Sequence, residues 1–308
     1  MPEIGHGSYG KVYVGKTDKG DPCAVKVGKA DERTPQLAYE ARVLRALQKC
    51  RGVPRIFGYW VSDPPKANKH LAMELLGDTL EARLQQHRLP MTVVMGSIAP
   101  TYIRILKDIH GQGFLHRDIK PQNMMTGPAT DPTSLYLIDY GLSKRYTYPQ
   151  GGHIEFRDGK RLTGNLRYAA VSVHLGHESS RQNDMEALGY VLVYFARGGL
   201  LPWMSTTKGQ TPHVINERVK NSKMAMRVDT LCEGLPAAFA HYLRHVRSLK
   251  FDQKPDYEFL ASLFEVGLHD IMSTASMVGS VVSLSSRSRT GSRTGSRTGS
   301  QASGTKVT

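Results

Sequence analysis

The sequence predicts an α+β fold with two lobes, a small strand-rich lobe over about residues 1–76 and a larger helical lobe over residues 77–270. Three observations lead to this prediction. The first 80 residues have the pattern of short strands with one helix, whereas the pattern beyond them is mostly helical. The composition changes near residue 270. Finally, 308 residues with 40% apolar side chains suffice for a full-sized core, so two lobes can enclose a cleft.

The small lobe should contain two strands joined by a turn, then one helix, then two more strands. The strands are expected at 11–14, 23–27, 55–61 and 70–75. Thr34 and Pro35 are typical of a helix N-cap and the first helical position. The apolar residues of this helix share one face, at Leu37, Ala41, Leu44 and Leu47. The strand that precedes residues 11–14 should be cut short by the start of the chain.

Three helices and a short buried strand organise the larger lobe. The helices are expected at 92–110, 181–197 and 236–248, and the strand at 135–138. Pro100 falls inside the first helix, after Gly96. Because an interior proline costs about 3 kcal/mol, this helix should kink or restart at Pro100.

The chain is basic, with 41 Lys and Arg against 27 Asp and Glu, which gives a net charge of +14. This charge favours acidic partners, namely nucleic acid, anionic lipid or an acidic protein. The three cysteines are far apart and form no C-x-x-C pair, which argues against disulfides or a zinc site and suits a reducing compartment. No signal peptide or membrane-spanning stretch is apparent, so we expect a soluble protein of the cytoplasm, the nucleus or both.

The last segment, residues 271–308, has Ser, Thr or Gly at 22 of 38 positions and repeats Ser-Arg-Thr-Gly three times from Ser288. It carries four Arg and one Lys but no acidic residue. Such a segment cannot bury enough apolar surface to offset the entropy of ordering it. We therefore expect a disordered basic tail.

A glycine-rich segment with the spacing G-x-G-x-x-G occurs at Gly5, Gly7 and Gly10. A dinucleotide-binding unit would continue as a helix, but a strand with alternating Val12 and Val14 follows. This order favours a hairpin over phosphates, because missing side chains let backbone N–H groups approach an anion. On this motif alone, an ordinary turn and a phosphate-binding hairpin are given equal weight.

Lys26 lies on the next strand, two residues after Ala24. A strand lysine usually packs its stem and keeps its amine in water. The functional alternative is that Lys26 holds nucleotide phosphates and is itself held by a helix carboxylate. Glu40, on the helix that follows, is the natural candidate, and its ordinary alternative is a solvated glutamate.

The strongest signal is H-R-D-x-K-x-x-N at His116–Asn123, followed by Asp139-Tyr140-Gly141 after a buried strand. The glycine segment and the strand lysine precede it in the order that phosphoryl-transfer enzymes show, which argues against a chance match.

Phosphoryl transfer requires alignment and charge neutralisation rather than covalent chemistry by the protein. In this loop, Asp118 would orient the acceptor hydroxyl and take its proton. Lys120 would neutralise the transferred phosphoryl group, and Asn123 and Asp139 would hold Mg²⁺.

At these motifs the chain resembles eukaryotic protein kinases, and further blocks are similar to the casein kinase I family. These blocks are MELLG at 73–77, LTGNLRYA at 162–169, HLGHE at 174–178, SRQNDMEALGYVL at 180–192, LPW at 201–203 and PDY at 255–257. The resemblance covers roughly residues 3–268, and these blocks lie outside the generic kinase motifs. As in that family, the usual A-P-E motif is absent, and Ala170-Val171-Ser172 stands in its place.

The resemblance implies a bilobal protein kinase fold and a monomeric, non-specific serine/threonine protein kinase that uses ATP and Mg²⁺. Its acceptor residues would lie near acidic or phosphorylated residues, and it would act without activation-loop phosphorylation. Nucleic acid and membranes are not expected as partners. The implied catalytic residues are Lys26, Glu40, Asp118 and Lys120. The implied nucleotide-binding residues are Gly5, Gly7, Ser8, Gly10, Val12, Ala24, Lys26, Met73, Glu74, Leu76, Asn123 and Asp139. The implied anion-binding surface consists of Arg117, Lys160 and Arg167.

Asp184 would anchor the catalytic loop from the central helix, and its ordinary alternative is an acidic residue that favours the helix dipole. Ile215 stands where the family has an anion-binding lysine, which puts phosphate-primed selectivity and a family nuclear-targeting signal in doubt. Tyr140 replaces the usual Phe and should do little harm.

Two rival functions remain. A pseudokinase scaffold would have lost Lys26, Asp118, Asn123 or Asp139, but none is lost. Alternatively, the basic tail could bind nucleic acid or anionic partners as its main function. A solvated tail or a phosphorylation target is the simpler interpretation of that segment.

Overall fold

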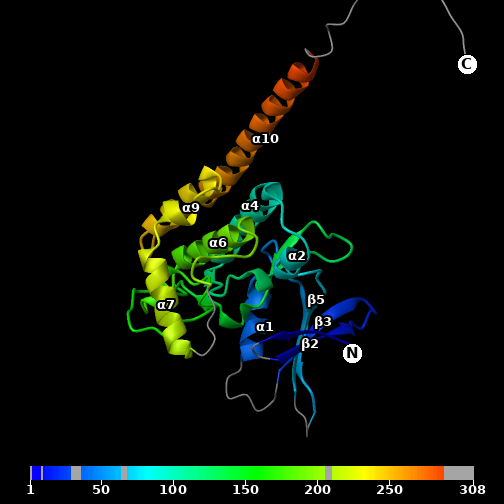
Figure 1. Cartoon of the computed structure of the whole chain (residues 1–308). Helices are drawn as coiled ribbons and strands as arrows, with labels where there is room; N and C mark the ends of the chain where they lie inside the picture. The colour runs from blue at the N-terminus through cyan, green and yellow to red at the C-terminus, as the bar shows by residue number, and fades with distance from the viewer. Residues whose placement is uncertain (1, 8–9, 29–35, 64–67, 205–209, 288–308) are drawn as a thin grey trace, which may run out of the picture. The chain divides into compact units, whose positions relative to one another are not determined.

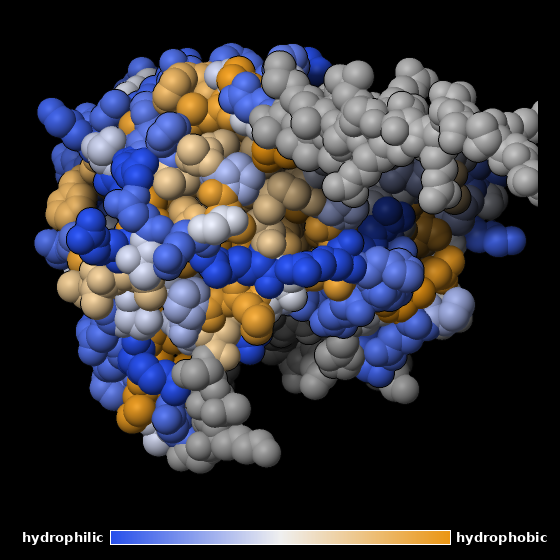
Figure 2. All heavy atoms as spheres, turned by 45° about the horizontal axis from the view of Figure 1, so that its top comes forward, coloured by the Kyte–Doolittle hydropathy of each residue, from blue (hydrophilic) through white to orange (hydrophobic). Residues whose placement is uncertain are grey.

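The computed structural model describes residues 2–7, 10–28, 36–63, 68–204 and 210–287, with side chains as far as residue 273 except at residues 6 and 7. The chain divides into two compact units, Met1–Leu268 and His269–Thr308. In the first unit, an N-terminal sheet, drawn in blue, stands beside a larger group of helices (Figure 1). Hydrophilic residues dominate the face shown in Figure 2, and apolar residues form smaller patches between them.

The N-terminal sheet has five antiparallel strands in the order β1-β2-β3-β5-β4. The strands are β1 (Glu3–Gly7), β2 (Gly10–Lys16), β3 (Pro22–Gly28), β4 (Ile56–Val61) and β5 (Lys69–Glu74). β1 has five residues and pairs with β2 along the glycine-rich segment. The other strands lie within two residues of their predicted bounds.

The register of this sheet puts four residues of the expected nucleotide site on one side. Val12 pairs with Lys26, and Ala24 pairs with Met73. Directly paired residues of antiparallel strands project to the same face, and alternate residues of one strand share a face. Val12, Ala24, Lys26 and Met73 therefore face the same way.

Helix α1 (Gln36–Ala46) covers part of the sheet. Its apolar face, with Leu37, Ala41 and Leu44, is buried against β4 and β5. Thr34 and Pro35, the expected start of this helix, lie outside the described residues.

The remainder of the first unit is mainly helical. Its helices are α2 (Leu80–Gln86), α3 (Met91–Val93), a π-helical turn (Val94–Ile98), α4 (Ala99–Gly111), α5 (Val171–His174), α6 (Arg181–Ala196), α7 (Pro212–Ala225), α8 (Val228–Leu231) and α9 (Ala237–Ser248). Two short hairpin-like pairs carry the loops between α4 and α5: β6 (Phe114–Leu115) with β9 (Lys144–Arg145), and β7 (Met124–Thr126) with β8 (Leu135–Leu137).

Helix α6 is the centre of this helical part. Its residues from Asn183 to Phe195 are all buried, and α4 and α9 pack against it. A helix that is enclosed on every side can hold polar residues only where they find partners. The buried Asp184 and Glu186 on this helix are therefore the residues whose contacts need explanation. The cysteines Cys23, Cys50 and Cys232 are buried and free.

Pro100 is accommodated by a wider turn rather than by a kink at the proline itself. The N–H of Ala99 donates to the carbonyl of Val94, five residues earlier, and α4 restarts at Ala99. Because a π-helical turn moves the hydrogen-bond pattern by one residue, the missing N–H of Pro100 falls in the first turn of the new helix, where it needs no partner. The predicted restart is thus present, one residue earlier and with a π turn that the sequence did not predict.

Helix α10 (Tyr257–Arg287) corrects the prediction of disorder from residue 271, because the helix continues to Arg287. The sequence explains the difference. Ile271, Ala275, Val278 and Val282 recur at helical spacing, a pattern that the count of Ser, Thr and Gly obscured. The rest of the expected tail, residues 288–308, lies outside the described residues. Within the described part of the chain, no helix combines the length and apolarity needed to cross a membrane.

Gly189 allows α6 and α9 to pack closely, and we predict that Gly189→Ala destabilises the protein. A Cβ there would lie 2.5 Å from Leu243 Cδ2 and 2.9 Å from Tyr242 Cε1, both on α9. Overpacking of this kind costs about 1–3 kcal/mol. The melting temperature should fall by about 2–4 °C for each kcal/mol lost.

Gly111→Ala is the matched control, because a Cβ at Gly111 in α4 meets nothing within 4 Å. This substitution should leave the melting temperature unchanged or slightly raised, since alanine favours helix more than glycine. Equal melting temperatures for the two variants would contradict the proposed close packing.

Candidate active site

Lys26 on β3 connects the sheet to the helical part. Its Nζ donates to Glu40 Oε2 at 2.7 Å and to Asp139 Oδ1 at 3.1 Å. Lys26 and Glu40 are only 6% and 2% exposed, so neither is the solvated surface residue that was its ordinary alternative. These contacts bring β3, α1 and the residue after β8 together.

Helix α1 is held against the Asp139 segment by two further hydrogen bonds. Gln36 Nε2 donates to the carbonyl of Gly141 at 2.8 Å, and the Tyr39 hydroxyl donates to the carbonyl of Ser143 at 2.9 Å. The first turn of α1, the helix that carries Glu40, is therefore fixed by both Gln36 and Tyr39. This is the arrangement in which Glu40 can hold Lys26.

The charges of Lys26 and Asp139 stabilise each other, whereas burial raises the pKa of Glu40 above its usual value against the effect of the Lys26 ammonium. Burial alone would lower the pKa of Lys26, but the neighbouring carboxylates of Glu40 and Asp139 outweigh it and raise that pKa. Burial would raise the pKa of Asp139, but the Lys26 ammonium lowers it below the usual value. Lys26 is thus a cation and Asp139 an anion at neutral pH.

The hydroxyl of Tyr140 finds a partner inside the protein. Tyr140 is fully buried, its OH donates to the carbonyl of Leu137 at 3.0 Å, and its ring meets His116 edge-on at 5.0 Å. A buried hydroxyl without an acceptor would destabilise the site by about 1–3 kcal/mol. The Tyr in place of Phe is therefore accommodated, as predicted from the ring it retains.

Asp118, Lys120 and Asn123 form a compact polar cluster. Lys120 Nζ lies 2.5 Å from Asp118 Oδ2, and Asn123 Nδ2 donates to the Asp118 carbonyl at 2.9 Å and to Asp118 Oδ2 at 3.2 Å. Asp118 is 5% exposed. The carboxylate is thereby held in place by a cation and an amide while one of its oxygens remains outside these contacts.

Asp184 fixes the backbone that precedes Asp118. Its Oδ2 accepts from the N–H of His116 at 2.8 Å, and its Oδ1 accepts from the N–H of Arg117 at 2.8 Å. Arg117 has a φ of 67°, a conformation that a residue other than glycine keeps only when its surroundings impose it. Asp184 also contacts His110 Nε2 at 3.0 Å, and both side chains are buried. The predicted anchor is therefore present, and His110 is a partner that sequence reasoning did not identify.

Asn123 and Asp139 suit a magnesium ion that is shared with a nucleotide. Asn123 uses its Nδ2 for Asp118, which leaves Oδ1 as an oxygen ligand beside the Asp139 carboxylate. Mg²⁺ typically takes one or two protein oxygens and completes its shell with phosphates and water. No group of three His, Cys, Asp or Glu that could hold a metal occurs among the described residues.

The glycine-rich hairpin and the segment after β5 offer backbone groups to a nucleotide. A Cβ on Gly10, whose φ is 150°, would collide with the carbonyl of Val27, so a side chain there would push β2 away from β3. After β5, which ends at Glu74, the backbone of Leu76 makes no hydrogen bond among the described residues. The nucleotide-binding roles of both places stay predictions, and Ser8 lies outside the described residues.

The three residues of the expected anion-binding surface have different environments. Arg117 is half-buried and its Nε donates to the carbonyl of Leu142 at 2.7 Å. Lys160 pairs with Glu178 at 3.4 Å, and Arg167 is exposed. Arg167 is therefore the member most available to a ligand.

Two buried charged residues near this surface escaped the sequence analysis. Glu178, 5% exposed, lies between Lys144 at 2.7 Å and Lys160 at 3.4 Å. Lys223 on α7 is completely buried and donates to the carbonyls of Leu166 and Ala169 at 2.8 and 2.6 Å. One signal pointed to Lys223: it follows Val219 by four residues, on the buried face of the helix.

We predict that Asp184→Asn destabilises the protein at neutral pH and flattens the acid side of its stability profile. Burial would raise the pKa of Asp184, but hydrogen bonds from His110 and the His116 N–H lower it below its usual value. A carboxylate with a depressed pKa adds stability above its unfolded pKa and loses it as the pH falls through the folded one. Denaturant unfolding at pH 7 should show a loss of about 3 kcal/mol, which shrinks toward pH 3.

Asp229→Asn is the control, because Asp229 is half exposed and pairs with Arg244 at the surface. It should change the unfolding free energy by less than about 1 kcal/mol at either pH. A loss for Asp184→Asn that stays constant from pH 7 to pH 3 would contradict the charged hydrogen-bond network.

Comparison with protein families agrees with this geometry. The sequence matches the protein kinase domain over residues 1–266, which is most of the chain and includes every residue of the site described above. The β-rich N-terminal part and the helical C-terminal part are consistent with the two lobes of the protein kinase fold. The chain belongs to the protein kinase family.

Proposed function

We propose that this protein is a serine/threonine kinase of the casein kinase I type, which transfers the γ-phosphoryl group of ATP to Ser or Thr of protein substrates. One observation carries the proposal. The Lys26–Glu40–Asp139 cluster and the Asp118–Lys120–Asn123 cluster are both assembled, with the contacts that an active kinase requires.

The residues divide the reaction among them. Lys26 would hold the nucleotide phosphates, with Glu40 holding Lys26 in place. Asp118 would orient the acceptor hydroxyl and take its proton as the hydroxyl oxygen bonds to the γ-phosphorus. Lys120 would neutralise the transferred phosphoryl group as its bond to the ADP oxygen breaks. Bound Mg²⁺, held by Asn123 and Asp139, would neutralise phosphate charge.

Serine/threonine specificity and the casein kinase I assignment rest on the sequence blocks. Lys120, two residues after Asp118, is typical of the Ser/Thr class, and its 2.5 Å contact with that carboxylate fits such a role. The blocks from Met73 to Tyr257 support the narrower assignment.

Acidic substrates fit the charge of the molecule. The first 270 residues carry 36 basic and 27 acidic residues, a net charge of 36 − 27 = +9. Arg167 is exposed beside the site, but Ile215 is half-buried and packs against the core. We therefore propose a preference for acidic sequences with weaker phosphate priming than the family resemblance alone implies.

Activity without activation-loop phosphorylation is supported by Glu178. This buried carboxylate pairs with Lys144 at one end of the segment 144–160 and with Lys160 at the other. Both ion pairs hold the pKa of Glu178 below its usual value, against the effect of burial. An internal anion thus does what a phosphate group would do in a kinase that needs phosphorylation to order this segment.

The pseudokinase alternative is less well supported, because the residues it should lack are present and in contact. A nucleic-acid-binding tail would involve residues 288–308, which lie outside the described residues. We further propose that the protein acts as a monomer in the cytoplasm, the nucleus or both.

We predict that Asp118→Asn and Lys26→Met each lower kcat for casein phosphorylation by at least about a thousandfold. Each variant removes several kcal/mol of transition-state stabilisation. Transfer of radiolabelled phosphate from ATP measures the rate, and circular dichroism checks that the Asp118 variant is folded.

Asp21→Asn and Lys19→Met are the matched controls, because both residues are exposed on the turn between β2 and β3. They should retain wild-type turnover. Wild-type activity of Asp118→Asn would overturn the site assignment, and an inactive wild-type protein would favour the scaffold alternative.

We predict that phosphatase-treated protein remains active and that Glu178→Gln lowers its kcat/KM at least about tenfold, because the variant breaks two ion pairs of a buried carboxylate. Glu155→Gln is the control, since Glu155 is 77% exposed and its contact with Arg157 is 4.0 Å long. Loss of activity after phosphatase treatment, restored by phosphorylation of the segment 144–170, would contradict the role of Glu178.

A further inference from the structure

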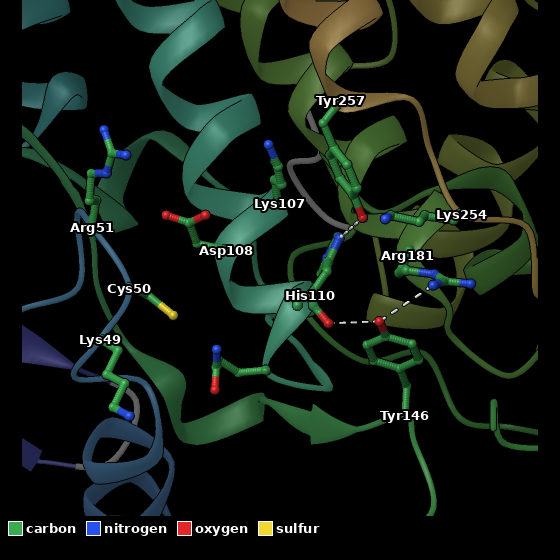
Figure 3. A pocket seen from close by; sticks show the side chains of 12 residues that line it. Lys49, Cys50, Arg51, Lys107, Asp108, His110, Tyr146, Arg181, Lys254 and Tyr257 are labelled. Atoms are coloured by element: carbon green, nitrogen blue, oxygen red, sulfur yellow. Dashed lines mark hydrogen bonds between the residues drawn. The ribbon is translucent and has the colours of Figure 1, made fainter. Parts of the chain in front are cut away.

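A second cavity, of about 470 Å³, lies apart from the residues of the active site. Five stretches of chain line it: the loop 49–51 after α1, the end of α4 at 107–112, Tyr146 after β9, Arg181 at the start of α6, and residues 254–257 at the start of α10. Figure 3 shows Lys49 and Arg51 on one side, Arg181, Lys254 and Tyr257 on the other, and Lys107, Asp108 and His110 between them. A cavity of this volume is large enough to enclose a ligand rather than a single ion.

The lining is strongly basic. It contains five cationic residues and one acidic residue, Asp108. Three of the cations, Lys49, Arg51 and Lys254, are exposed and make no hydrogen bond or ion pair among the described residues. Lys107 pairs with Glu258 at 2.6 Å, but Glu258 is 58% exposed, and such surface pairs contribute little. The cavity therefore concentrates positive charge that the protein itself does not neutralise.

Arg181 is incompletely satisfied at the wall of this cavity. Its Nη2 donates to the carbonyl of Asp252, and its Nη1 lies 3.5 Å from the Tyr146 hydroxyl. Its Nε is buried and has no hydrogen-bond partner. A nearby anion stabilises a buried guanidinium with an unused donor more than it stabilises a solvated guanidinium. The hydroxyls of Tyr146 and Tyr257 add neutral polar groups to the same wall.

We propose that this cavity, which we call the rear pocket, binds a phosphoserine- or phosphothreonine-containing peptide segment. A phosphate monoester carries nearly two negative charges and three acceptor oxygens, so it suits several separate Lys and Arg donors better than one carboxylate does. The cations on both sides of α4 favour an extended ligand with further acidic residues. The aromatic residues of this lining, His110, Tyr146 and Tyr257, meet edge-on or at a tilt, and both tyrosine hydroxyls are hydrogen-bonded to His110. They therefore do not form the stacking platform that single-stranded nucleic acid prefers.

The rear pocket is connected to the catalytic loop by hydrogen bonds. Tyr257 OH lies 2.7 Å from His110 Nδ1, and His110 Nε2 lies 3.0 Å from Asp184. Asp184 in turn holds the N–H groups of His116 and Arg117. Helix α1 carries Glu40, and a bound segment would also connect the loop after this helix to the start of α6. Binding should therefore make the catalytic loop more rigid.

Calorimetry on the full chain tests the binding. The probe is a peptide with one phosphoserine among glutamates and no free hydroxyl residue. Its unphosphorylated alanine counterpart, inorganic phosphate and a single-stranded oligonucleotide are the comparison ligands. The triple variant Lys49→Ala, Arg51→Ala, Lys254→Ala should weaken binding of the phosphopeptide at least about tenfold, which is 1.4 kcal/mol. Inorganic phosphate should bind more weakly than the phosphopeptide, and added salt should weaken both.

Two further variants locate the site. Lys16→Ala, Lys19→Ala, Arg45→Ala removes the same charge from exposed positions elsewhere and should leave the affinity unchanged. Lys160→Ala, Arg167→Ala removes two of the three residues of the anion-binding surface at the active site; it should weaken only a separate binding event there and leave the affinity of the rear pocket within about twofold. Wild-type affinity of the rear-pocket variant, loss confined to the Lys160/Arg167 variant, or tighter binding of the oligonucleotide through the same residues would each overturn the proposal. Because binding does not require phosphoryl transfer, this result is independent of the proposed kinase activity.

Amide hydrogen exchange tests the connection. The phosphopeptide should slow exchange at His116 and Arg117 in the wild type but not in Tyr257→Phe, which keeps the cations and removes the hydroxyl that contacts His110. Tyr257→Phe should still bind the peptide. Unchanged exchange in the wild type at saturating peptide, or equal slowing in both proteins, would overturn the connection to the catalytic loop.

Discussion

The ion pair between Lys26 and Glu40, extended to Asp139, is the constraint on which the rest of the structure depends. A lysine and a glutamate that are almost fully buried are tolerated only as partners, because either one alone would be an uncompensated charge in the interior, at a cost of about 3–5 kcal/mol. Three separate segments supply the three charges. The position of α1, the end of β8 and the sheet are therefore coupled, and the hydrogen bonds of Gln36 and Tyr39 to the Asp139 segment act in the same direction.

A second buried network plays the same part for the catalytic loop. Asp184 on the central helix accepts two backbone N–H groups and contacts His110, so the left-handed residue Arg117 is held in a conformation it would not adopt alone. Asp118 follows Arg117 directly, so the same hydrogen bonds fix its position. One network starts from the sheet and α1, and the other starts from α6, the buried helix at the centre of the helical part.

The parts that the sequence predicted are those encoded locally. Strands appear as runs of β-branched residues, and the catalytic residues occur in short motifs such as His116–Asn123, so both could be located without coordinates. The parts it did not predict depend on contacts between distant segments. Glu178 resembles any other surface glutamate until Lys144 and Lys160 are brought to it, and the rear pocket is assembled from five stretches of chain. The helix beyond residue 271 was missed because composition was weighed above spacing.

Lys223 shows how the fold stabilises the segment where the A-P-E motif would stand. Its ammonium meets the carbonyls of Leu166 and Ala169 and, at 3.1 Å, His174 Nε2. The charged amine has three N–H donors, and two of them meet these carbonyls. Burial nevertheless lowers the pKa of Lys223 to about 7, with Glu186 opposing the shift and Arg247 adding to it.

Between this pKa and the unfolded value of about 10.4, the unfolded chain binds the extra proton, so this group adds stability as the pH rises through that window. Below it, the native state bears the cost of a buried cation, which the two carbonyls, the imidazole and the rings of Tyr190 and Trp203 at 5.1 and 5.3 Å offset. The buried ammonium of Lys223 thus holds the carbonyls of Leu166 and Ala169, in the segment that leads away from the catalytic loop.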